Sequence, residues 1–437
     1  MPESGTATSS ESAAARPCAD PSSEPSAEPS GSREGIGRGL VLLLAVACGA
    51  AVANLYYAQP LLHTLGQDLG VSDGTAGLLV TVSQVGYVLG LAFLVPVGDL
   101  RERRALISGT LIVTAGALGV AAAAPTFIVF ALALGAVGIT SVVAQIIVPM
   151  SSSLSAEHER GQVVGTVMSG LLIGILLART VSGLVAAALG WRTVFALAAV
   201  GMIALAVTLR RRLPLVPPTT KLGYRGTLRS VLTLIRAEPV LRQRMLMGGL
   251  IFGCFSVLWT SLAFLLAGPP FHYGNAIIGL FGIAGVAGAL AASVVGRLAD
   301  RGHGARATTV SLIVLLISWA ILAAGKTAVI PLIIGIAALD LGVQGVHISN
   351  QSAIYALHGD ARSRLTTAYM VSYFLGGAIL SALTSTLYSS AGWDGVCLLG
   401  AITAAVTLAV WLASTYALRR RRRRPVHAEP RLAQAED

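Results

Sequence analysis

Two ionisable residues lie inside long apolar stretches of the sequence, Asp340 and Arg179. Placing such a group at membrane depth costs about 2.5–3.5 kcal/mol on insertion scales, so it persists where it faces water or a partner. Gln344 and His347 follow Asp340 at the fourth and seventh positions, on one helical face. This stripe predicts the wall of a wet chamber in which Asp340 and His347 take up and release protons. The alternative is a polar contact that holds this helix to a neighbour.

Arg179 predicts a binding group for an anionic part of a substrate, or a state-dependent partner for Asp340. A structural arginine bonded to carbonyl oxygens is the alternative. Two polar pairs are spaced as on one helical face, Ser141 with Gln145 and Asn54 with Tyr57, and bonding between helices explains them equally well. The candidate substrate-binding residues are therefore Arg179, Gln344, Gln145, Asn54 and Tyr57.

The sequence carries no pattern typical of an enzyme or a metal site. The four cysteines form no CxxC pair, and Cys48, Cys254 and Cys397 sit in apolar stretches as small hydrophobic residues do. No G-x-x-x-x-G-K loop for a nucleoside triphosphate is present. We therefore expect no catalytic residue, no metal, no cofactor and no ATP-driven step.

The composition indicates a helical protein that crosses a membrane many times. Of the 437 residues 54% are apolar and 12% are charged, against about 25% charged in soluble domains. A helix needs about 20 apolar residues to cross the lipid core. Twelve stretches of that kind predict an all-α protein with spans near 39–64, 75–97, 105–124, 126–151, 162–188, 193–210, 245–267, 276–297, 307–325, 329–352, 365–388 and 394–417.

The loops between these spans carry an uneven distribution of basic residues. With both termini inside, 28 of the 31 lysines and arginines lie on the inner side, and only Arg192 and Lys326 lie outside. Cytoplasmic loops are enriched in this way, so both termini are predicted to be cytoplasmic. The basic stretch 419–424 is expected to attract anionic lipid at that face rather than nucleic acid.

The two halves of the sequence repeat one another. Arg160, Met168, Gly174, Gly190 and Trp191 recur 202 positions later as Arg362, Met370, Gly376, Gly392 and Trp393. Such parallel repeats build transporters whose substrate site lies between the halves. The predicted organisation is a disordered tail 1–35, a six-helix half 36–210, a cytoplasmic linker 211–244, a second six-helix half 245–418 and a basic tail 419–437.

Two loop motifs and two phrases within spans connect the chain to a known family. The loop after the second span reads GDLRERR at 98–104, and the loop after the eighth reads GRLADRG at 296–302. The phrases NLYYAQP at 54–60 and DLGVQ at 340–344 are similar to those of one branch of bacterial permeases. On these residues the chain resembles the major facilitator superfamily over residues 38–418, and within it the drug–proton antiporter branch.

This resemblance implies a multi-pass carrier in the bacterial inner membrane, expected to be a monomer, that moves a small-molecule substrate. An acid at a helix end can pair with an arginine and face the positive end of another helix, which makes a latch that forms in one state only. The resemblance places this latch at Asp99, Arg103, Arg104, Asp300 and Arg301, and a charge cluster that only orients the chain is the alternative. The Gly-Pro signature of drug antiporters in the fifth span is not retained, since Ile175 replaces its proline.

Three functions remain on the sequence alone. The first is proton-coupled efflux of a small organic molecule by alternating access. The second is a proton-coupled or passive importer of a small metabolite. The third is a membrane sensor that does not transport, and the short tails, which look unstructured, argue against it.

Overall fold

The computed structural model describes residues 36–156, 158–215, 223–285, 304–357 and 362–422. Within these ranges the regular structure is helical, with no strand. Backbone groups in lipid must be satisfied inside the spanning segment, and a helix does this. The predicted all-α membrane fold is confirmed.

Nine of the described helical segments are long and apolar enough to cross a membrane. One of them, Ser363–Tyr416, covers the two predicted spans 365–388 and 394–417. Two shorter apolar helices, Arg38–Ala53 and Asn275–Gly285, fall at the predicted first and eighth spans. The count of twelve stays a prediction, because part of the predicted eighth span lies outside the described ranges.

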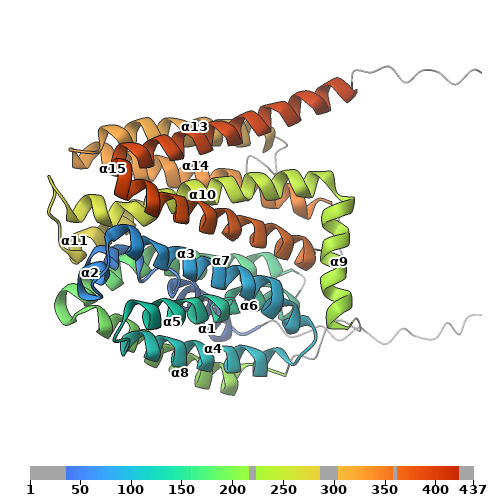
Figure 1. The fold of residues 1–437 in the computed structure, drawn as a ribbon. Helices are drawn as coiled ribbons and strands as arrows, with labels where there is room; N and C mark the ends of the chain where they lie inside the picture. Colours follow the sequence, from blue (N-terminus) through green and yellow to red (C-terminus); the bar gives the residue numbers. More distant parts are fainter. Residues whose placement is uncertain (1–35, 157, 216–222, 286–303, 358–361, 423–437) are drawn as a thin grey trace, which may run out of the picture.

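The helices form two groups that lie side by side (Figure 1). The first group contains α1 (Arg38–Ala53), α2 (Leu62–Asp68), α3 (Asp73–Leu89), α4 (Arg103–Ala122), α5 (Phe127–Thr140), α6 (Val143–Leu154), α7 (Arg160–Leu189) and α8 (Trp191–Arg212). The second contains α10 (Pro239–Ala267), α11 (Asn275–Leu280), α13 (Gly304–Ala324), α14 (Val329–Tyr355) and α15 (Arg362–Arg422). Short turns of helix extend some of these: η1 (Gln59–Leu61), η2 (Gly90–Leu94), η3 (Val95–Asp99) and η4 (Phe281–Gly285).

Polar caps mark where several helices begin. The side chain of Ser72 accepts a bond from the backbone N–H of Thr75 at the start of α3. Glu102 accepts from the N–H groups of Arg104 and Ala105 at 2.9 and 2.8 Å at the start of α4. Such caps satisfy backbone donors that the first turn leaves free, so they fix where the chain re-enters a helix.

The predicted first span is not one continuous helix. Helix α1 ends at Ala53, and residues 54–58 form a turn in which Leu55 and Tyr56 bond to carbonyls three positions back. Pro60, in η1, lacks an N–H for a regular helical bond. Asn54 and Tyr57 therefore lie in a turn after α1 and not within one continuous helix, and their role at a shared site stays a prediction.

Two glycines at repeat-related positions turn the chain between consecutive spans. Gly190 lies between α7 and α8 with φ +83°, and Gly392 lies within α15 with φ +59°. Residues with a side chain rarely adopt this backbone conformation. Each glycine is followed by a buried tryptophan whose indole N–H is bonded, Trp191 to Asp68 and Trp393 to the carbonyl of Leu322.

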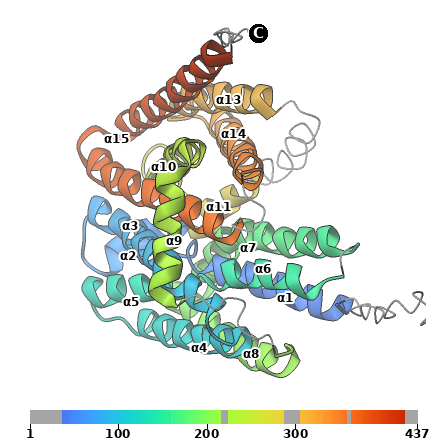
Figure 2. The ribbon, with the colours of Figure 1, turned by 90° about the vertical axis from the view of Figure 1, so that its right-hand side faces the viewer.

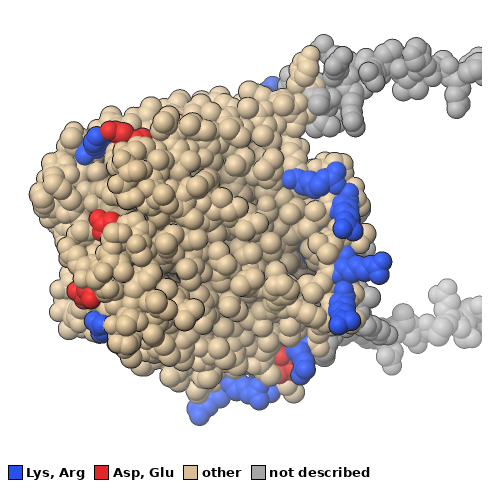
Figure 3. Space-filling view, in the orientation of Figure 1, with Lys and Arg blue, Asp and Glu red and all other residues tan. Residues whose placement is uncertain are grey.

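The basic residues gather at one end of the molecule, here called the basic end (Figure 3). This is where α8 finishes with Arg210, Arg211 and Arg212. Helix α9 (Tyr224–Ala237) crosses the same end, perpendicular to the two groups (Figures 1 and 2). The hydroxyl of Tyr224 donates to the carbonyl of Phe93 at 3.0 Å, which ties α9 to the first group.

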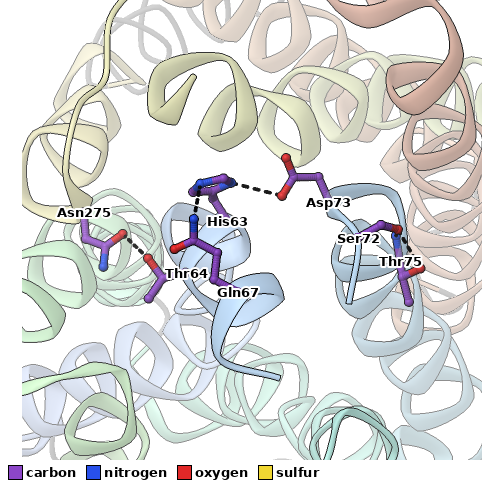
Figure 4. A network of polar contacts seen from close by, with 7 residues as sticks. All are labelled: His63, Thr64, Gln67, Ser72, Asp73, Thr75 and Asn275. Carbon is purple, nitrogen blue, oxygen red and sulfur yellow. Dashed lines mark hydrogen bonds and ion pairs between the residues drawn. The ribbon is translucent and has the colours of Figure 1, made fainter. Parts of the chain in front are cut away.

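The contact between the two groups, here called the seam, is formed by α3 against α15, by α7 against α11 and η4, and by α10 against α2, η1 and α3. Helix α7 meets α11 without side chains between them: a Cβ added to Gly183 would lie 2.3 Å from the carbonyl oxygen of Asn275. At the end opposite the basic end, Thr64 donates to the side-chain oxygen of Asn275 at 2.9 Å across the seam (Figure 4). The seam is closed at that end.

A second contact in Figure 4 lies within the first group. His63 stands between Gln67 and Asp73, with a ring nitrogen 3.0 Å from an atom of each. These contacts of His63 fix the loop between α2 and α3 beside the seam.

Candidate functional site

Arg179 lies on α7 at the seam and is almost completely buried, with 1% of its surface exposed. Its Nε donates to the side-chain oxygen of Gln59 at 2.8 Å, which belongs to η1 of the same group. One terminal nitrogen of the guanidinium has no hydrogen-bond partner. A buried donor without a partner is costly, so this nitrogen is available to a ligand or a rearranged neighbour.

Three aromatic rings surround the guanidinium of Arg179. Its central carbon lies 4.7 Å from the ring centre of Tyr56, 5.3 Å from that of Phe255 and 3.8 Å from that of Trp259. Cations are attracted to ring faces at such distances. Tyr56 comes from the first group, whereas Phe255 and Trp259 come from α10 of the second, so the rings hold Arg179 across the seam.

Asp340 lies on α14, on the other side of the seam. It is 5% exposed, and one carboxylate oxygen has no hydrogen-bond partner. The other carboxylate oxygen packs against Gly285 of η4. A Cβ added to Gly285 would lie only 2.5 Å from this oxygen, so the position has no room for a side chain.

Asp340 and Arg179 interact through their charges without forming an ion pair. The carboxylate is close enough to Arg179 for a Coulomb attraction. No nitrogen–oxygen distance between them is 4.0 Å or less. Each side chain therefore keeps one buried polar atom without a hydrogen-bond partner, although the two charges lie near each other.

A small cavity adjoins Arg179 at the seam. Its volume is about 10 Å³, which is room for about one water molecule. Its lining residues are Gln59, Pro60, Arg179, Trp259, Leu262, Ala263 and Ile278. A larger ligand therefore needs the seam to open.

His347 lies two helical turns from Asp340 on α14 and bonds inside the second group. Its Nδ1 is 3.0 Å from the hydroxyl of Tyr369, and the amide of Asn350 donates to the same hydroxyl at 3.5 Å. Asn350 in turn accepts from Arg244 at 3.0 Å. His347 thus belongs to a polar chain with Tyr369, Asn350 and Arg244, and within the described part of the molecule no hydrogen bond links this chain to Asp340. Its role in proton coupling stays a prediction.

The other candidate binding residues lie apart from Arg179 and Asp340 or show no bond to them. Gln145 donates to the hydroxyl of Tyr87 at 3.4 Å, and the amide of Asn54 contacts the sulfur of Met202 at 3.5 Å. Tyr57 accepts through its backbone oxygen from Ser182 on α7. Gln344 is half-buried. Their role in binding a substrate stays a prediction.

The predicted latch is described only in part. Arg103 donates to the carbonyl of Gly98 at 3.1 Å, and Arg104 donates to that of Leu213 at 3.4 Å. The side chain of Asp99 and the whole of Asp300 and Arg301 lie outside the described part. The latch stays a prediction.

Sequence reasoning missed Gln59 and Tyr56 as neighbours of Arg179. Both stand in the phrase NLYYAQP, and Gln59 is a polar residue inside an apolar stretch. That signal could have identified Gln59. The signal for Tyr56 is weaker, because tyrosine is common in apolar cores.

Comparisons with known proteins agree with this architecture. The family model described as Major Facilitator Superfamily matches residues 41–358. The chain belongs to the Major Facilitator Superfamily. The transporter YgaY of Escherichia coli O157:H7 is 50% identical to this superfamily member over 372 residues, which cover 85% of this chain and 94% of YgaY. The protein is therefore a multi-pass membrane transporter and not an enzyme.

Two more distant relatives give further context for this transporter. The chloramphenicol resistance protein of Streptomyces lividans is 27% identical over 289 residues, covering 64% of this chain and 71% of that protein. A bacterial homolog of the human lysosomal transporter Spinster shares the fold, with a TM-score of 0.68 and 13% identity over 88% of this chain and 96% of that one. The bacterial sources of the curated relatives are consistent with an inner-membrane location.

Proposed function

We propose that this transporter couples a small organic molecule to protons by alternating access, and that it exports the molecule. The two groups would be the two halves predicted from the sequence, rocking about the seam. Asp340 would carry the proton, and Arg179 would hold the substrate or return to Asp340 when the substrate leaves. The basic end would face the cytoplasm.

The main observation in support of this proposal is the buried position of Asp340. The residue is buried at the seam with one unpaired oxygen, on the face of α14 that meets η4. A buried ionised carboxylate whose oxygens are not all bonded is costly in such a place, and a proton removes most of that cost. Two states that differ in water access to Asp340 would therefore bind the proton in one and release it in the other.

Export rests on sequence likeness. The residues at 54–60 and 340–344 resemble efflux permeases, and one relative is a chloramphenicol resistance protein. In an exporter of this kind the inward flow of protons resets the carrier after the substrate has left.

Import is the second candidate, and the pair of Arg179 and Asp340 favours it. Arg179 has an unpaired nitrogen and interacts through its charge with the carboxylate of Asp340. An anion entering there is repelled by ionised Asp340 and accepted once Asp340 is protonated. Anion and proton would then bind together and travel in the same direction.

Proton movements in inside-out membrane vesicles separate the two directions. Chloramphenicol and benzoate serve as a neutral and an anionic probe, added outside vesicles that report luminal pH by dye fluorescence. A carrier that exports its substrate in exchange for protons moves protons out of the vesicle lumen. Adding the substrate then makes an acidic lumen less acidic. A carrier that moves both together makes a neutral lumen more acidic.

The same vesicles can also show that transport is not coupled to protons. If a radiolabelled probe accumulates through this protein while luminal pH stays constant, and a collapsed proton gradient leaves its accumulation unchanged, the transport is not proton-coupled. Vesicles without the protein are the control for leakage.

A further inference from the structure

A groove on the outside of the first group runs between α4 and α8, away from the seam. Its volume is about 400 Å³. Small or apolar side chains line most of the groove, and two arginines stand at one end. The lining residues are Ala105, Ser108, Gly109, Ile112, Ala206, Val207, Arg210 and Arg211. Figure 3 shows basic side chains gathered over this end of α8.

The orientation of the two helices places the arginines at the basic end of the groove. Helix α4 begins at this end and α8 finishes there. From Ala105 to Ile112 the groove follows α4 for two turns, which is roughly 10 Å at 1.5 Å per residue. Ile112 and Val207 are exposed apolar residues, as expected of a surface that faces hydrocarbon. The groove thus has a cationic end at Arg210 and Arg211 and an apolar part, here called the slot, lined by Ala105, Gly109, Ile112, Ala206 and Val207.

Gly109 keeps the slot open. A Cβ added at this residue would meet no atom within 4 Å, so the space beside it is empty. Gly109 is also in the middle of a helix, where glycine is less favourable than most residues by about 1 kcal/mol. A side chain there would project into the slot rather than into another helix.

We infer that this groove binds one anionic phospholipid, with its phosphate on Arg210 and Arg211 and an acyl chain in the slot beside Gly109. Arginine donates to phosphate oxygens in a forked geometry. A free phosphate ion or an acidic peptide would leave the apolar slot unfilled, whereas a lipid fills both parts. The proposal is independent of the transported molecule and of the seam.

Native mass spectrometry of the purified full-length protein tests the site. The protein in detergent is titrated with phosphatidylglycerol or with phosphatidylcholine, and the lipid retained on each molecule is counted. We expect one phosphatidylglycerol bound well above the level of phosphatidylcholine. Arg210→Gln with Arg211→Gln should weaken phosphatidylglycerol binding about 30-fold, since each basic residue near a surface contributes about fivefold.

Two further variants separate the groove from general charge attraction. Gly109→Leu keeps every charge and fills the slot, so it should weaken the binding about tenfold. The matched control is Arg225→Gln with Arg229→Gln, which removes two exposed arginines of α9 at the same end and should bind as the unchanged protein does. Size-exclusion chromatography of each variant confirms that it is folded.

Three results would overturn the inference. Gly109→Leu could retain the lipid undiminished, or the α9 control could lose it as completely as the groove variant does. Inorganic phosphate could displace the lipid, which would make the site one for a free anion.

Discussion

At the level of single residues, the central feature is an arginine and an aspartate that lie near each other at the seam without forming an ion pair. Arg179 is held in this state by Gln59 and three rings rather than by Asp340. Asp340 has a free oxygen and therefore room to change its partner or its protonation. Two buried charges that do not pair add little to stability, so this arrangement suits a switch better than a structural link.

Asp340→Asn tests the acid directly. An amide keeps the shape of the side chain but cannot take up a proton, so the variant should reach the membrane in normal amounts and lose substrate-dependent proton flux. The flux is measured in the vesicles described above, with the probe that the unchanged protein moves. Asp394→Asn, at an exposed ion pair with Lys326, is the control and should keep it. Full proton flux in Asp340→Asn would assign the proton to another group.

The sequence predicted Asp340 and Arg179 as isolated charges in apolar stretches, because membrane depth makes such charges rare. It could not predict that Gln59, Phe255 and Trp259 surround Arg179. Those contacts join segments about 80 to 120 positions apart in the chain, and only tertiary packing brings them together.

At the scale of elements, α7 and α11 approach through glycines. Gly183 and Gly279 meet backbone to backbone, with a Cβ at Gly279 only 2.6 Å from the carbonyl oxygen of Arg179. Close contacts of this kind let helices slide or separate without interlocked side chains. The contact therefore suits a seam that opens in the transport cycle.

Gly183→Val should open the seam at this point. A valine has no space beside Asn275, and overpacking of this kind costs about 1–3 kcal/mol. We expect a cysteine placed at Ile278, which lines the cavity, to react with a maleimide at least about fivefold faster in this variant. The native cysteines among the described residues are buried and form a low background.

Gly116→Val is the matched control, because a Cβ there meets nothing within 4 Å. It should leave the reactivity at position 278 unchanged. Equal rates in Gly183→Val and Gly116→Val would mean that this contact does not close the cavity.

Alanine substitutions test whether the turns at Gly190 and Gly392 depend on glycine. Gly190→Ala and Gly392→Ala force a side chain into a backbone conformation that essentially only glycine adopts, which costs about 1–3 kcal/mol although space for the Cβ exists. Each should lower the temperature of thermal unfolding in detergent. Gly201→Ala, in the open middle of α8, should leave it unchanged or raise it. If the variants at Gly190 and Gly392 unfold like the control, the turns do not depend on glycine.

At the scale of the whole molecule, the uneven distribution of charge predicts its orientation in the membrane. Basic residues at the α8 and α9 end would face the cytoplasm, and Arg192 with Lys326 would face outward. In intact cells an impermeant maleimide should label a cysteine at Lys326, and a cysteine at Arg225 should react only after the membrane is opened. The reverse pattern would invert the topology and with it the proposed direction of transport.

The class of fold, the family, the repeat and the two charges inside apolar stretches can all be predicted from the sequence. Each of these follows from local composition or from spacing along the chain, because a lipid environment selects apolar helices and penalises an isolated charge wherever it stands. The residues that surround Arg179, the approach of Asp340 without an ion pair and the closed end of the seam appear only in the folded structure. These depend on how two groups of helices pack together, which the spacing of residues in either group does not specify.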